Sequence, residues 1–137
     1  MKSHFAAPDL CLKLNICEKI RSKELFLMSD IMKNISRAET LKLKDETVCQ
    51  SGQVVSKTLV QNGAVSMTLF AFADGEEIST HESGGDAFAV CINGKGIITI
   101  DGAPHELCEG DAILMPARHP HAVLGKEEFK MLLTVVF

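Results

Sequence analysis

The sequence predicts an all-β fold, an antiparallel barrel or sandwich, with a short N-terminal helical extension before it. From residue 52 onward, short runs rich in β-branched and aromatic residues alternate with turn signals at regular spacing. No apolar pattern of helix length interrupts these runs. The first fifty residues differ in character, and 137 residues suffice for one domain with one buried core. We therefore expect one β domain with a lead-in segment.

Residues 1–31 are expected to form the N-terminal extension. Apolar side chains recur there at helical spacing, at positions 10, 14, 17, 20, 25, 28, 31 and 32. Asp9 is a candidate N-cap for this helix. Other apolar residues fall outside the stripe, so the helix would need a partner surface on the barrel or on a second subunit. A poorly ordered extension is the alternative. We place the start of the barrel domain at Met32, which gives a domain of residues 32–137.

The β domain is expected to contain nine short strands. They are residues 54–60, 64–72, 76–81, 87–92, 96–100, 104–107, 111–116, 121–124 and 129–137. Between them, glycine and asparagine supply the positive φ that tight turns require. The segment NGKG at 93–96 is the strongest hairpin signal. The last strand ends the chain on an apolar run, which favours burial.

Composition narrows the class of partner. The formal net charge is −4, and there is no lysine- or arginine-rich run and no Trp or Tyr to stack on bases, so nucleic acid is not expected. No stretch approaches the roughly 20 apolar residues of a membrane span. The five cysteines are scattered without a C-x-x-C pair. We expect reduced thiols in a cytoplasmic protein that binds a small molecule.

Two spaced motifs carry the chemistry. Their skeleton is Gly75, His81 and Gly94 in the first, and Gly110, Pro116 and His121 in the second. Arg118 stands where the second motif usually has glycine. Residues 52–137 resemble the cupin family, small single-domain barrels of the conserved-barrel type. This resemblance implies a double-stranded β-helix, or jelly-roll barrel.

The resemblance also implies a divalent metal, Zn, Ni, Mn or Fe, held by four side chains. The corresponding positions here are His81, Ser83, Ala87 and His121. Only the two histidines are good donors, whereas a protein-held metal usually takes three or more. We expect His81 and His121 to converge in the barrel pocket as candidate metal ligands.

Three neighbours are candidate substitutes for the missing donors. Asp86 adjoins the vacant position of Ala87 but points to the other face unless the preceding glycines re-aim it. Cys91 shares strand parity with Ala87, as a soft ligand or as a small buried hydrophobe. His119 lies two residues before His121, as a ligand or as a rim residue.

The remaining pocket wall is expected to be small and smooth. Its candidate lining residues are Ser83, Ala87, Ala89, Met67 and Met115, although both methionines also suit the core. Arg118 at the mouth is either a partner for a ligand carboxylate or phosphate or a solvated loop residue.

The function expected from these features is the binding of a small organic molecule, with a candidate divalent metal. Whether the chain is an enzyme, and its catalytic residues, stay open, because cupins by resemblance include dioxygenases, isomerases and lyases. A metal-free ligand-binding module is the alternative. A dimeric scaffold is another, and we expect a homodimer formed by the last strand and the N-terminal helix.

Overall fold

The computed structural model describes residues 31–137, and residues 33–137 form one compact unit. The helix expected in the N-terminal extension lies outside the described residues, apart from its last position, Ile31. Within the described part of the chain, no helix is long and apolar enough to cross a membrane.

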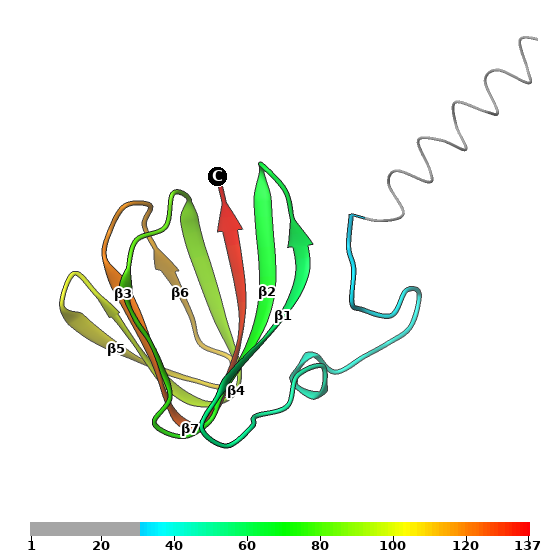
Figure 1. The fold of residues 1–137 in the computed structure, drawn as a ribbon, viewed down its shortest axis with the longest axis horizontal. Helices are drawn as coiled ribbons and strands as arrows, with labels where there is room; N and C mark the ends of the chain where they lie inside the picture. The colour runs from blue at the N-terminus through cyan, green and yellow to red at the C-terminus, as the bar shows by residue number, and fades with distance from the viewer. Residues whose placement is uncertain (1–30) are drawn as a thin grey trace, which may run out of the picture. The chain divides into compact units, whose positions relative to one another are not determined.

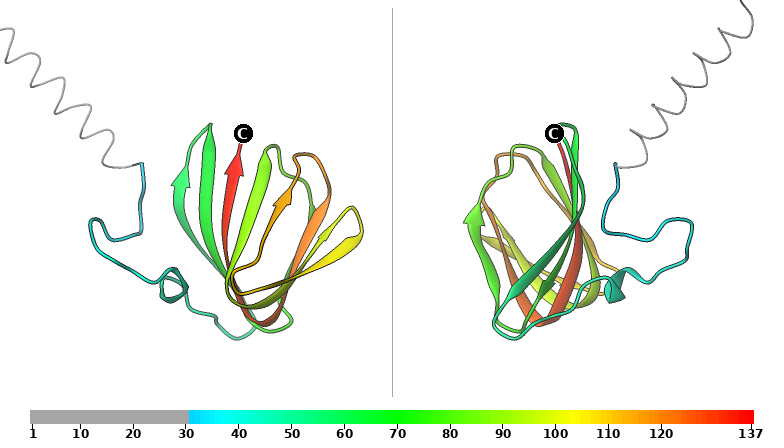
Figure 2. Two further views of the ribbon diagram at one scale, coloured as in Figure 1. Left: turned by 180° about the vertical axis from the view of Figure 1, so that it is seen from behind. Right: turned by 45° about the vertical axis from the view of Figure 1, so that its right-hand side comes forward.

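The described chain is a β-barrel of seven strands with one turn of 3-10 helix before it, which confirms the all-β prediction (Figure 1). The elements are η1 (Leu43–Asp45), β1 (Val54–Gln61), β2 (Val65–Phe72), β3 (Glu77–His81), β4 (Asp86–Ile100), β5 (Ala103–Cys108), β6 (Ala112–Met115) and β7 (His121–Val136). All strand pairs are antiparallel, in the order β1-β2-β7-β4-β5, with β3 on β7 and β6 on β4. The strands converge at one end and spread apart at the other (Figure 2).

Two long strands replace four of the predicted short ones. β4 runs through the segment predicted as an NGKG hairpin, so that prediction was wrong. Its register with β7 shifts between Cys91 and Gly96 instead of reversing. Gly94 has φ 70°, and a Cβ there would collide with the Glu127 carbonyl oxygen. Here a positive-φ glycine makes a bulge, which bends a continuous strand.

The bend lets each long strand serve two parts of the barrel. The first half of β4 pairs with β6 and its second half with β5. β7 pairs with β3 through its first residues and with β2 through its last. A real two-residue turn does join β4 to β5, at Asp101 (φ 50°) and Gly102 (φ 80°), as the positive φ of a hairpin turn requires. β4 contains Gly94 of the first motif, and β7 begins with His121 of the second.

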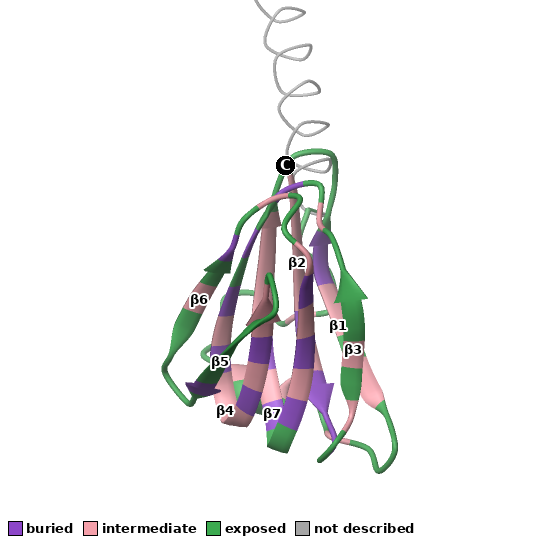
Figure 3. Cartoon of the chain, turned by 90° about the vertical axis from the view of Figure 1, so that its left-hand side faces the viewer, coloured by how far each residue is buried: buried purple, intermediate pink, exposed green. Residues whose placement is uncertain are grey.

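Buried and less buried residues alternate along the strands (Figure 3). The buried apolar residues form two clusters. The interior cluster consists of Phe72, Ala87, Ala89, Cys91, Ile98, Leu107, Met115, Val123, Phe129 and Met131. The outer cluster consists of Leu59, Val60 and Leu69, against which Ile35 and Leu43 of the lead-in segment pack. The Lys130 ammonium donates to the carbonyl oxygens of Lys44 (2.6 Å) and Thr47 (2.7 Å), which ties this segment to β7.

Candidate functional site

His81 and His121 face each other across neighbouring strands. They are register partners on β3 and β7, and their ring centroids lie 4.4 Å apart with the rings inclined at 64°. His121 is buried, with 4% of its surface exposed, whereas His81 is exposed. The structure therefore brings the two motif histidines together, one anchored in the barrel and one open to solvent.

Main-chain carbonyls orient both imidazoles. The Nδ1 atom of His81 lies 2.9 Å from the Ser79 oxygen, and that of His121 lies 2.9 Å from the His119 oxygen. A carbonyl oxygen only accepts, so each Nδ1 must carry the hydrogen. In the neutral imidazoles the Nε2 atoms then keep their lone pairs. The pair then offers two hydrogen-bond acceptors, on rings whose centroids lie 4.4 Å apart.

The other two family ligand positions offer no donor to this pair. The Ser83 hydroxyl accepts from the Gly85 N–H (3.3 Å), and its carbonyl accepts from the Arg118 N–H (2.9 Å). Ala87 is buried in the interior cluster, opposite Met115 on β6. Ser83 therefore joins the two motif loops, and Ala87 fills the core.

The candidate substitute donors are engaged elsewhere. Asp86 is exposed and its Oδ1 accepts from the Ala117 N–H (2.9 Å). His119 turns to Asp101, with 2.7 Å between Nδ1 and Oδ2. Within residues 31–137, no group of three or more His, Cys, Asp or Glu side chains is placed to hold a metal ion.

Cys91 lies in the interior cluster, only 1% exposed. Its thiol donates weakly to the carbonyl oxygens of Asn93 and Gly94, at 3.5 Å each. Burial raises the pKa of this thiol above its ordinary value, because the thiolate would lose its hydration. The Cys91 side chain thus packs within the interior cluster, as the interpretation of a small buried hydrophobe expects.

The remaining candidate pocket residues divide between the two faces of the barrel wall. Ala89 and Met115 lie in the interior cluster. Met67 packs instead on the outer cluster, because alternation along β2 turns it to the same side as Leu69. Arg118 is exposed with φ 65°, the left-handed backbone that suits the glycine usual at this position.

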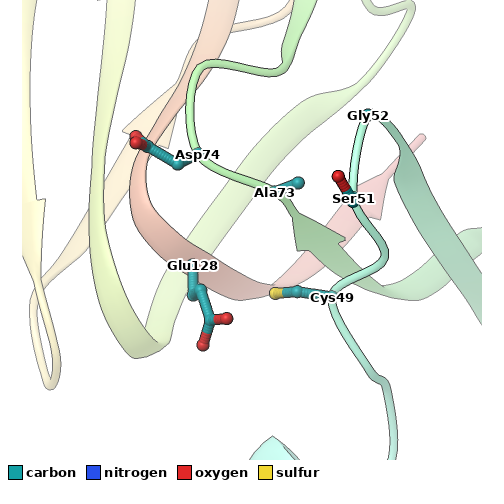
Figure 4. Close-up of a pocket in the computed structure, with 6 residues that line it drawn as sticks. All are labelled: Cys49, Ser51, Gly52, Ala73, Asp74 and Glu128. Carbon is teal, nitrogen blue, oxygen red and sulfur yellow. The ribbon is translucent and has the colours of Figure 1, made fainter.

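A separate cleft of about 280 Å³ was not foreseen from the sequence. It is lined by Cys49, Ser51, Gly52, Ala73, Asp74 and Glu128 (Figure 4). Neither motif histidine lines the cleft, and Glu128 lies seven residues after His121 along β7. Burial raises the pKa of the Cys49 thiol, which opposes nucleophilic reactivity. Three segments far apart in the sequence form this cleft, and no spacing pattern connects them.

Comparisons with known proteins agree on the fold. The family model of the cupin domain matches residues 68–137 of this chain. A conserved protein of unknown function from Streptococcus pyogenes is 41% identical, covers 77% of this chain and 92% of its own, and superposes with a TM-score of 0.75. A cupin superfamily protein from Desulfitobacterium hafniense DCB-2 is 35% identical over 77% of this chain and 97% of its own, with a TM-score of 0.74.

One curated relative has an assigned activity. The dimethylsulfoniopropionate lyase DddW of Ruegeria pomeroyi is 28% identical over 96 residues, which are 66% of this chain. The match spans 63% of the length of that lyase.

Proposed function

The chain belongs to the cupin family, and we propose that it binds a small organic molecule at His81 and His121 without a tightly held metal. The observation that carries this proposal is the pair of Nδ1 hydrogen bonds to main-chain carbonyls. They leave two Nε2 lone pairs, from rings 4.4 Å apart, as the chemistry of the site.

The donor set does not fit the four-ligand metal site that the family resemblance implies. Two imidazoles leave most of a metal's coordination sphere to water, and such binding is weak. Ala87 has no donor atom, and the Ser83 hydroxyl is a neutral, poor ligand. The carboxylate of Asp86 and the ring of His119 have other partners. We therefore derive the chemistry from the imidazoles alone.

Two neutral imidazoles can accept hydrogen bonds from a ligand hydroxyl, amine or protonated acid. A neutral imidazole can also act as a general base through its Nε2 lone pair. The burial of His121 beside the exposed ring of His81 gives the ligand one fixed contact and one open approach. The guanidinium of Arg118, in the loop three residues before His121, is suited to a ligand carboxylate.

A lyase activity is the second candidate, favoured by the similarity to dimethylsulfoniopropionate lyase. In an elimination a base takes a proton from carbon, the electron pair of the broken C–H bond forms the double bond, and the leaving group departs from the adjacent carbon with its own electron pair. An Nε2 lone pair can be that base. The substrate of this chain need not be that of the relative.

The three cysteines described in the structure are free, which supports our proposal of a cytoplasmic location.

A ligand screen on metal-stripped protein tests the proposed function. Small carboxylates, dimethylsulfoniopropionate among them, are titrated while thermal stability and turnover are measured. We expect at least one compound to raise the Tm of the wild-type protein, and His81→Ala and His121→Ala each to abolish that rise. Ser79→Ala, which keeps the carbonyl that orients His81, is the matched control. Binding that survives both histidine substitutions would contradict the proposal.

The proposed homodimer needs a different interface from the one expected. The last half of β7 is paired on both edges, with β2 and β4, so its edge is not available. Phe88 (44% exposed) and Leu114 (52% exposed) are cross-strand neighbours on the outer face of β4 and β6. Such an apolar pair supports face-to-face association of two copies. Light scattering should give a dimer that Leu114→Asp converts to a monomer, and a monomeric wild-type chain would exclude this interface.

A further inference from the structure

We propose that Asp101 is a positioning residue for His121. It holds the His119–Pro120 peptide, whose carbonyl oxygen orients the His121 imidazole. The role rests on the proposed function, since it matters only if Nε2 of His121 meets the ligand. Asp101 lies outside both motifs, in the turn between β4 and β5.

Asp101 bonds the loop before β7 twice. Its main-chain N–H donates to the Pro120 carbonyl oxygen (2.9 Å). Its carboxylate Oδ2 accepts from the ring Nδ1 of His119 (2.7 Å). One residue therefore holds the residue on each side of a single peptide bond.

The His119–Pro120 peptide has few hydrogen-bonding groups of its own to fix its orientation. Because proline has no N–H, the only hydrogen-bonding group of the His119–Pro120 peptide is the His119 carbonyl. This carbonyl accepts from Nδ1 of His121 (2.9 Å). The bonds at Ala117 and Arg118 anchor the earlier part of the loop, and the His119 N–H donates within the loop to the Pro116 carbonyl oxygen (3.3 Å). The Asp101 contacts are the ones that reach His119 and Pro120 from another turn.

The effect of this contact should appear at His121 rather than in global stability. Asp101 and His119 are each about half exposed (50% of each side chain), and exposed pairs contribute little to folding free energy. If the His119 carbonyl moves, however, Nδ1 of His121 loses the acceptor that keeps its hydrogen there. The imidazole can then carry the hydrogen on Nε2, which removes the lone pair that the ligand needs.

Nitrogen NMR of the histidine rings in the full chain, at an alkaline pH chosen so that the two neutral tautomers are compared, tests this role. Asp101→Gly removes the carboxylate and tolerates the φ of 50° at this turn. Asp101→Asn keeps a side-chain oxygen, and asparagine also adopts left-handed backbone readily. We expect Asp101→Gly to raise the Nε2–H fraction of His121 about five-fold, the change that loss of one net hydrogen bond gives. Asp101→Asn should stay near wild type.

His119→Ala provides an independent check, because it keeps the carbonyl while removing the ring that Asp101 holds. It should give the same shift as Asp101→Gly, and the double variant should give no more than either alone. Unchanged His121 signals in Asp101→Gly, or equal changes in the Gly and Asn variants, would overturn the positioning role. A wild-type His121 that carries its hydrogen on Nε2 would instead contradict the proposed function itself, so the two failures are distinct.

Discussion

The two histidine positions and the two lost ligand positions of the same site differ in what surrounds them. His81 and His121 sit opposite each other in the β3–β7 register, each with its Nδ1 bound to a main-chain carbonyl. Ser83 joins two loops, and Ala87 is packed into the interior cluster. On the proposed function, the first region supplies the chemistry of a ligand site and the second region is structural. The proposal thus separates the motif glycines and the two oriented imidazoles from the four-donor metal site that the family resemblance implies.

Introducing donor side chains at positions 83 and 87 should have the largest effect, on metal affinity. Ser83→His with Ala87→Glu should raise the affinity for Zn²⁺ or Ni²⁺ by at least about a hundred-fold, because four donors replace two. Without metal, the buried carboxylate at position 87 should lower stability by about 3 kcal/mol. Calorimetric titration and thermal melting measure the two effects.

The control for that variant is Ser83→His with Ala87→Gln, which has similar volume but no charge. Its gain in metal affinity should be much smaller. If the glutamate variant gained no affinity, positions 83 and 87 would not be the counterparts of the family ligands.

Replacing each of the two glycines of the first motif by alanine should lower stability by different amounts, because their surroundings differ. Gly94→Ala should destabilise the protein by about 3 kcal/mol or more, because the new Cβ meets the carbonyl oxygens of Glu127 and Glu128 in addition to the positive-φ penalty. Gly75→Ala, with φ 81° but nothing within 4 Å of the new Cβ, should cost about 1 kcal/mol. Urea denaturation gives both values, and equal losses would show that the bulge at Gly94 is not tightly packed.

Substitution of Arg118 in the second motif should stabilise the protein, unlike the substitutions of the first-motif glycines. Arg118→Gly should stabilise the protein by about 1 kcal/mol, because glycine adopts the φ of 65° without strain. The same change should weaken binding of carboxylate ligands. Arg118→Ala separates the two effects, since it removes the charge and keeps the strained Cβ, and its stability should remain near wild type.

The smallest expected effect is on the pH dependence of stability, and it comes from Cys91 on β4. Because burial raises the pKa of the Cys91 thiol above the ordinary 9.0, the folded chain holds this proton more tightly than the unfolded chain. The resulting stability is present below pH 9.0 and is lost as the pH rises through the folded-state pKa. Between about pH 8 and about pH 10, Cys91→Ala should lose less stability than the wild type, and urea denaturation across this range measures the difference. An identical loss in both proteins would mean that Cys91 ionises without leaving the folded core.

The approximate positions of the strands along the chain could be predicted from local sequence, but their order in the sheet and the side-chain partners could not. The Asp-Gly turn at 101–102 and the bulge at Gly94 both use positive-φ glycines, and local sequence does not distinguish a turn from a bulge. Strand parity placed Ala87, Ala89 and Cys91 on a common face, as the structure has them. Parity within β2 does not say which face is inward, and Met67 lies on the outer one.

The substitute donors show the same limit for the site. Asp86 accepts from Ala117, 31 residues away, and His119 pairs with Asp101, 18 residues away. Neither contact follows from spacing, because each depends on how the loops of the two motifs meet. The orienting carbonyls of Ser79 and His119 lie two residues before their histidines, and only the backbone conformation reveals them.

Elemental analysis of the full chain, purified without a histidine tag, tests the central claim most directly. A site with two protein donors predicts less than about one transition-metal ion per ten chains, unaffected by His81→Ala or His121→Ala. Near-stoichiometric Zn, Ni, Mn or Fe that either substitution removes would contradict the account. It would show that the histidine pair still holds a metal.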